Sequence, residues 1–121
     1  MPKKILIVDD EELLTKSFSK ILERQGYEVY TVRSGADAVV MVEEEKFDLI
    51  ISDIRMPGET GVETIKKIRE NSKFPIPVIF ITGYADEKIE KEAKTLEPTA
   101  YLFKPFDTKQ FLDLVKTTLG S

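Results

Sequence analysis

The sequence predicts a single α/β domain, residues 1–121, with five parallel strands and helices on both faces of the sheet, a doubly wound (βα)5 arrangement. Five strand-like segments alternate with five helix-like segments, which is typical of βαβ units. The length suits one domain, and neither a linker nor a repeat interrupts the alternation. Strands are expected at residues 4–8, 28–32, 49–52, 78–82 and 100–103.

The strand segments differ in their apolar pattern. Residues 4–8, 49–52 and 78–82 are nearly continuous apolar runs, which indicates strands buried on both faces. Residues 28–32 mix polar and apolar side chains, so this strand is expected at an edge of the sheet.

Local signals predict where the helices begin and end. Gly26 and Gly120 follow apolar-periodic segments at positions where a left-handed residue ends a helix. A hydroxyl or carboxylate residue followed three positions later by an acidic or amide residue predicts an N-terminal cap. Such patterns begin the second, third and fifth helices, at Ser34-x-x-Asp37, Thr60-x-x-Glu63 and Asp107-x-x-Gln110.

The fourth helix is expected over residues 86–96 and has the least apolar surface to bury. Only Ile89, Ala93 and Leu96 form an apolar stripe among many charges. We expect this helix to be the most easily displaced element.

The composition excludes several classes of function. The chain has no cysteine and no histidine, which removes disulfides, thiolate metal sites and the usual general base. A net charge of −4 argues against direct nucleic-acid binding by this domain. The longest apolar runs are too short to span a membrane, and no signal-type segment follows the first residues. A cytoplasmic location is expected.

Polar residues follow four of the predicted strands. In an open parallel sheet, ligands bind beyond the carboxyl ends of the strands. With the strand order 2-1-3-4-5, these side chains converge at one edge. They are Asp9 and Asp10 after the first strand, Asp53 after the third, Thr82 at the end of the fourth and Lys104 after the fifth.

Each of these residues also has an ordinary structural interpretation. Asp9 and Asp10 can form a solvated turn or cap the first helix, and Asp53 can likewise be a turn aspartate. The combination at successive strand ends is the specific signal, because clustered carboxylates repel unless a cation or proton lies among them. Mg²⁺, or alternatively Mn²⁺, prefers such oxygen ligands.

Four motifs stand at the ends of the predicted strands. They are Ile7-Val8-Asp9-Asp10-Glu11, Asp53-Ile54-Arg55-Met56-Pro57-Gly58 with Gly61, Ile81-Thr82-Gly83, and Lys104-Pro105-Phe106. Together they resemble the motifs of response-regulator receiver domains, the phosphoacceptor modules of two-component signalling, including the chemotaxis receivers. The resemblance covers nearly the whole chain and implies a flavodoxin-like fold.

The resemblance implies a role for each matched residue. Asp53 would accept the phosphoryl group, while Asp9, Asp10 and the backbone carbonyl of Arg55 would help Asp53 to hold the metal. Lys104 would contact the phosphoryl group and Thr82 would offer it a hydroxyl. Tyr101 matches an aromatic switch position, so the face formed by the fourth helix, fifth strand and fifth helix is expected to change on phosphorylation.

The same resemblance implies the partners. The donor would be a sensor histidine kinase or a histidine phosphotransfer protein. The output would pass to a downstream effector or a fused output domain, and a phosphorylation-dependent dimer is left open. The domain would catalyse only its own phosphorylation and dephosphorylation.

Two other classes of function share parts of this pattern. A Mg²⁺-dependent aspartyl-phosphate phosphatase also uses an aspartate nucleophile, but its Asp-x-Asp is missing, because Ile54 and Arg55 follow Asp53. A flavodoxin-like binding module has the same strand order, but its first loop would bind a flavin phosphate, and here that loop is acidic.

Overall fold

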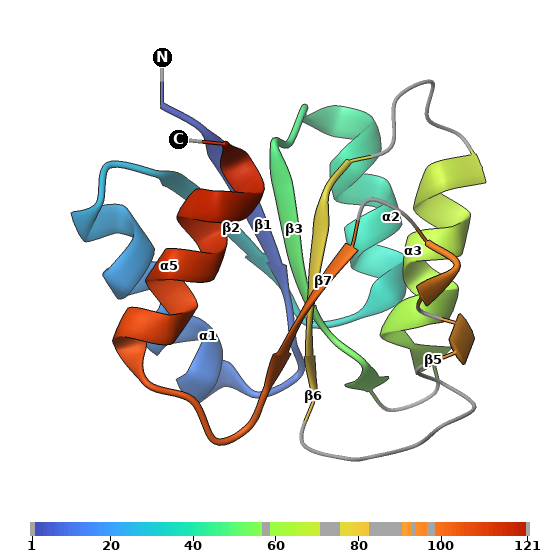
Figure 1. Ribbon diagram of the computed structural model, residues 1–121. Coiled ribbons are helices and arrows are strands. Elements are labelled where there is room, and N and C mark those ends of the chain that lie inside the picture. Colours follow the sequence, from blue (N-terminus) through green and yellow to red (C-terminus); the bar gives the residue numbers. More distant parts are fainter. Residues whose placement is uncertain are drawn as a thin grey trace.

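A parallel sheet of five strands forms the centre of the molecule, in the order β2-β1-β3-β6-β7 (Figure 1). The computed structural model describes residues 2–56, 59–70, 76–82, 91–92, 94–96 and 99–120. The predicted strand order is confirmed, and β2 lies at an edge as expected. The third and fifth predicted strands are each one residue longer than expected. The strands are β1 (Lys4–Val8), β2 (Glu28–Val32), β3 (Leu49–Asp53), β6 (Val78–Thr82) and β7 (Thr99–Phe103).

Helices cover both faces of the sheet (Figure 1). The helices α1 (Glu12–Arg24) and α5 (Thr108–Leu119) pack on one face, and α2 (Gly35–Glu44) and α3 (Gly61–Glu70) pack on the other. Successive residues of β1 point to opposite faces. Ile5 and Ile7 therefore join the α1/α5 core, and Leu6 and Val8 join the α2/α3 core.

The predicted helix caps are confirmed. The Ser34 hydroxyl accepts a hydrogen bond from the Asp37 amide at 3.1 Å, and the Thr60 hydroxyl accepts one from the Glu63 amide at 3.1 Å. At the start of α5, Asp107 and Gln110 exchange hydrogen bonds of 2.8 and 3.0 Å in a reciprocal capping box. Positive φ angles of 91° at Gly26 and 74° at Gly120 confirm the predicted left-handed helix ends.

Two features lie outside the sequence prediction or the described residues. The short strands β4 (Arg55–Met56) and β5 (Glu59–Thr60) form an antiparallel ribbon between β3 and α3. Strands of two residues are too short to give a periodic pattern, so the ribbon was not predicted. The predicted fourth helix, residues 86–96, falls mostly outside the described residues; Glu92 is helical, and its carboxylate lies 3.7 Å from the Lys66 ammonium of α3.

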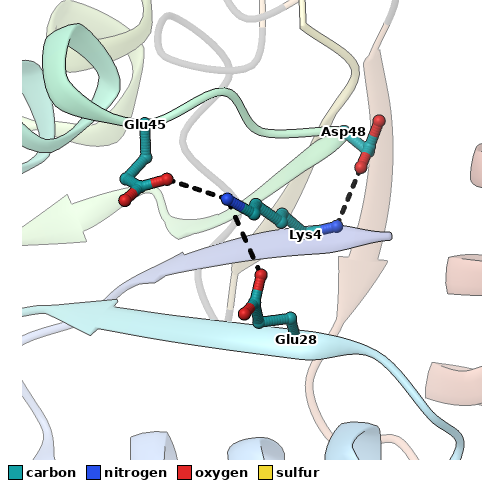
Figure 2. Close-up of polar contacts among 4 residues, drawn as sticks. All are labelled: Lys4, Glu28, Glu45 and Asp48. Atoms are coloured by element: carbon teal, nitrogen blue, oxygen red, sulfur yellow. Dashed lines mark hydrogen bonds and ion pairs between the residues drawn. The ribbon is translucent and has the colours of Figure 1, made fainter. Parts of the chain in front are cut away.

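A polar cluster around Lys4 ties three segments together at the amino ends of the strands (Figure 2). The Lys4 ammonium contacts the carboxylates of Glu45 at 2.8 Å and Glu28 at 3.7 Å. The Lys4 amide donates to the Asp48 carboxylate at 2.8 Å. The hydrogen bond to Glu45 is the largest cause that raises the pKa of Lys4. The cluster connects β1 to β2 and to the α2–β3 loop, at the end of the sheet opposite the polar strand ends.

No helix within the described part of the chain is long and apolar enough to cross a membrane.

Candidate functional site

The acidic residues predicted from the strand ends meet at the carboxyl edge of the sheet. Asp9 and Asp10 follow β1, and Asp53 ends β3, the neighbouring strand. One carboxylate oxygen from each of the three side chains lies within 4.8 Å of the other two. The parallel register therefore brings together residues that are more than forty positions apart in the sequence.

Asp9 is the buried member of the cluster, with 2% of its surface exposed. Burial is the largest cause that raises its pKa from 3.8 to about 6. The Glu11 amide opposes this shift by donating a hydrogen bond of 2.9 Å to Asp9 Oδ1. The nearby Asp53 carboxylate raises the pKa further, whereas the Lys104 ammonium lowers it. The Asp9 carboxylate therefore lies beside the negative charge of Asp53, and a cation could balance the two.

The interpretation of the acidic pair as the cap of the first helix is wrong. The N-cap of α1 is Glu11, whose own side chain makes no capping hydrogen bond. Asp9 instead accepts from the Glu11 amide in a local turn before the helix. Asp10 is exposed and Asp53 is half-buried. The carboxylates of Asp10 and Asp53 are thus accessible to an ion or substrate from solvent.

The cluster fits a hard divalent cation. The donor set consists of carboxylate oxygens, and one carboxylate is buried beside another. A cation between them would relieve the repulsion that raises the pKa of Asp9. The arrangement could therefore hold a metal ion of the kind that prefers oxygen ligands.

Hydrogen bonds from Ser52 and Gly61 hold the backbone around Asp53. The Ser52 hydroxyl, fully buried, donates to the Asp53 carbonyl at 3.0 Å. The Gly61 amide donates to the Ile54 carbonyl at 2.7 Å. A Cβ on Gly61 would collide with the Asp53 carbonyl and would lie 2.9 Å from Ser52 Oγ. The absence of a side chain at Gly61 therefore lets α3 begin close to the sheet.

Ser52 was missed as a supporting residue. Its signal in the sequence is a single hydroxyl at the end of the apolar run Leu49-Ile50-Ile51. A buried hydroxyl needs a hydrogen-bond partner. A serine at the end of a buried apolar strand is therefore expected to bond to the backbone nearby.

Thr82 and Lys104 lie on the next two strand ends. Thr82 is buried, and its backbone carbonyl accepts a hydrogen bond from the Lys104 amide at 2.9 Å. Lys104 is half-buried, and its charge acts on Asp9. The peptide bond between Lys104 and Pro105 is cis. The structure thus brings Lys104 into electrostatic range of the acidic cluster.

Tyr101 and Arg55 are the other two residues to which the resemblance assigns a role. In the register of β6 and β7, Tyr101 pairs with Phe80, two residues before Thr82, and its ring packs in the α2/α3 core. Arg55 is the first residue of β4 and follows Ile54, the residue after Asp53. The Arg55 side chain is outside the described residues. The switch and metal-ligand roles of these two residues stay predictions.

The comparisons with known proteins point to one family. The family model for the response regulator receiver domain matches residues 5–116. The polar-differentiation response regulator DivK of Brucella anthropi is 35% identical over 121 residues, which cover 99% of this chain and 98% of that protein.

Solved structures show the same similarity. The Vibrio cholerae chemotaxis protein CheY4 has a TM-score of 0.89 and 33% identity, covering 98% of this chain and 99% of that one. A CheY-like receiver domain protein from Methanospirillum hungatei has a TM-score of 0.93 and 31% identity, covering 99% and 95%.

A doubly wound sheet with an acidic cluster and a lysine at its carboxyl edge defines a phosphoacceptor signalling module. The chain belongs to the response regulator receiver domain family. It is a signalling domain of the two-component type, and neither the phosphatase nor the flavodoxin-like alternative is favoured.

Proposed function

We propose that Asp53 is the residue that accepts the phosphoryl group. The observation that carries this proposal is the convergence of the Asp53 carboxylate with those of Asp9 and Asp10, with Lys104 in electrostatic range. Asp53 is half-buried, so a donor can reach it, whereas Asp9 is nearly inaccessible. Asp53 also has its backbone fixed by Ser52. These properties suit a nucleophile that is positioned in advance.

The metal is proposed to be Mg²⁺, with Mn²⁺ as a substitute. Asp9, Asp10 and Asp53 would hold it, together with the backbone carbonyl of Arg55. When bound, the ion neutralises charge on the phosphoryl oxygens and on the carboxylates.

The protein's own residues account for the transfer. One Asp53 carboxylate oxygen forms a bond to phosphorus while the bond from phosphorus to the donor nitrogen breaks, and the electron pair leaves on the donor imidazole. The Lys104 ammonium compensates the charge of the phosphoryl oxygens, and the Thr82 hydroxyl donates to one of them. The product is an acyl phosphate on Asp53, which water later hydrolyses. The domain therefore acts on itself and turns over no other substrate.

The proposed donor is a sensor histidine kinase or a histidine phosphotransfer protein. Lys104 also lines a surface cavity of about 410 Å³ between α1 and α5, beside apolar side chains that include Leu14, Phe18 and Phe106. A donor protein that presents its phosphohistidine to Asp53 can bury this apolar surface in the same encounter. The lysine thus connects the reaction site to a surface suited to protein contact.

The remaining proposals concern the output. Phosphorylation is proposed to change the face that includes β7 and α5, which a downstream effector or a fused output domain would read. A phosphorylation-dependent dimer would use the same change. Residues 1–121 are proposed to form one receiver domain, and the cytoplasmic location stays a prediction.

Mass spectrometry of the intact protein tests the acceptor assignment. Incubation with Mg²⁺ and a small acyl-phosphate donor should add one phosphoryl group, and peptide mapping should place it on Asp53. Asp53→Asn should gain none under the same conditions. A stable phosphoryl group on another residue of that variant would contradict the assignment.

Metal titration tests the ion site separately. The parent protein should bind Mg²⁺ or Mn²⁺ with modest affinity, because much of the ion's shell remains water. Asp10→Ala should bind the ion more weakly. Equal affinity in parent and variant would exclude Asp10 as a ligand.

A further inference from the structure

Three aromatic rings form a row from the core to the surface at the β7 edge of the sheet. Phe80 on β6 is fully buried, and the Tyr101 ring stacks on it with a centroid distance of 6.1 Å and an interplanar angle of 30°. The Phe103 ring stacks on Tyr101 at 6.4 Å and 19°. Phe103 itself is 56% exposed. The half-buried tyrosine therefore lies between one buried ring and one exposed ring.

The alternation of side chains along β7 explains the row. Ala100 and Leu102 pack in the α1/α5 core, so Tyr101 and Phe103 point to the opposite face. Among the described residues, β7 is the edge strand of the sheet (Figure 1). Phe103 is exposed, and its ring stacks on that of Tyr101.

The Tyr101 ring faces the core. Its hydroxyl oxygen is buried, and the ring packs with the α2/α3 core. The Tyr101 ring therefore occupies an inward position in this structure. A contact that stabilises this position changes the balance between the two states of the domain.

We propose that Phe103 is a positioning residue that holds Tyr101 in its buried position before phosphorylation. The inference rests on the switch role of Tyr101 in the proposed function. Stacking of Phe103 on Tyr101 favours the buried position of the Tyr101 ring with and without phosphorylation. It therefore raises the population of the signalling conformation, the one with the ring buried, in the unphosphorylated protein. Phe103 thereby sets how large the change on phosphorylation is.

Fluorine NMR on protein labelled with 3-fluorotyrosine measures the ring position directly. The chain has four tyrosines, and Tyr101→Phe assigns the Tyr101 signal. The shift of that signal between H₂O and D₂O reports how exposed the ring is. In Phe103→Leu without phosphorylation, the ratio of exposed to buried ring should rise about 2- to 13-fold, the range that corresponds to one aromatic pair.

Two further variants separate stacking from the loss of exposed apolar surface. Phe103→Tyr keeps an aromatic ring and should restore the signal of the parent protein. Val40→Ala truncates an apolar side chain of similar exposure, 53%, on α2 and should leave the Tyr101 signal unchanged. Amide spectra and urea denaturation of each variant establish that it is folded.

The outcomes separate this inference from the proposed function. An unchanged Tyr101 signal in folded Phe103→Leu overturns the positioning role, and so does an equal change in Phe103→Tyr and Phe103→Leu. Beryllofluoride, a phosphoryl mimic, is then added to the parent and to Asp53→Asn. A failure of the parent to respond counts against the acceptor assignment, while the comparison without beryllofluoride still decides the role of Phe103.

Discussion

At the scale of single residues, Asp9 combines deep burial with a neighbouring negative charge. Both effects favour the neutral acid and raise the pKa to about 6. Because the folded-state pKa is above the ordinary value of 3.8, the favourable contribution is complete below about pH 4 and is lost as the pH rises through about 6. The ionised Asp9 therefore lowers the stability of the metal-free fold near neutrality.

We predict that Asp9→Asn stabilises the metal-free protein at neutral pH. The free energy of unfolding should rise by ~1–3 kcal/mol at about pH 7.5, and the gain should shrink at about pH 4, where the parent carboxyl is protonated. Urea denaturation with a chelator present measures both values. Asp10→Asn, at an exposed position, is the control and should have a smaller effect. A gain that is equal at both pH values would contradict the electrostatic cause.

The atoms around Gly61 leave no room for a side chain at this position. The Asp53 carbonyl and Ser52 Oγ occupy the space that a Cβ would need. Backbone and a buried hydroxyl cannot move aside as the end of a flexible side chain can, so an added methyl group must shift β3 or the start of α3.

We predict that Gly61→Ala lowers the free energy of unfolding by ~1–3 kcal/mol and slows phosphorylation of Asp53 by a small-molecule donor. The rate should fall because the displaced backbone carries Asp53, the proposed nucleophile. Thermal denaturation and the time course of intact mass measure the two effects. Normal phosphorylation kinetics with normal stability would show that the backbone absorbs the methyl group without displacing Asp53.

At the scale of elements, the caps determine where helices begin. The Asp107 side chain accepts a hydrogen bond from the Gln110 amide, and the Gln110 side chain accepts one from the Asp107 amide. This box starts α5 directly after the Lys104–Phe106 segment, so it also limits the motion of the loop that carries Lys104.

We predict that Asp107→Ala costs about 0.5–2 kcal/mol of unfolding free energy, the usual cost of losing an N-cap. Asp107→Ser keeps a capping oxygen and should recover most of the loss. Chemical denaturation of the three proteins measures the series. Equal stability of Asp107→Ala and the parent would mean that packing of Phe111 and Val115 alone holds the first turn.

At the scale of the whole molecule, the reaction site and the β7/α5 face are joined through adjacent strands. Thr82 and Phe103 are register partners, and the Thr82 carbonyl accepts from the Lys104 amide. A structural change at Thr82 on β6 would therefore be transmitted to β7 through the backbone hydrogen bonds between these two strands. If the phosphoryl group stabilises one conformation of the β7/α5 face over the other by ~1–3 kcal/mol, the affinity of a protein that binds this face changes by about 5- to 150-fold.

We predict that Thr82→Ala separates phosphorylation from its structural response. The variant should still accept a phosphoryl group on Asp53, because the carboxylate cluster is intact. The amide shifts that beryllofluoride induces in residues 86–119 of the parent should largely vanish in NMR spectra. Full-sized shifts in the variant would refute coupling through Thr82 and leave the acceptor assignment untouched.

The five strands of the main sheet and the chemical type of the site could be predicted from the sequence. Continuous apolar runs marked β1, β3 and β6, and the mixed segment marked β2 as an edge, because burial on two faces leaves no room for polar alternation. Capping pairs such as Asp107 and Gln110 act within one turn, so local sequence suffices to find them. The carboxylates and the lysine followed from the rule that parallel strands deliver their ends to one edge.

The surroundings of these residues could not be predicted from the sequence, because they depend on packing between distant segments. The pKa of Asp9 depends on burial by distant segments and on the approach of Asp53, which no local pattern encodes. The support of Asp53 by Ser52, the ribbon of β4 and β5, and the stacking of Phe103 on Tyr101 likewise depend on packing. Desolvation and close contact are properties of the assembled fold, whereas periodicity and capping are properties of the chain.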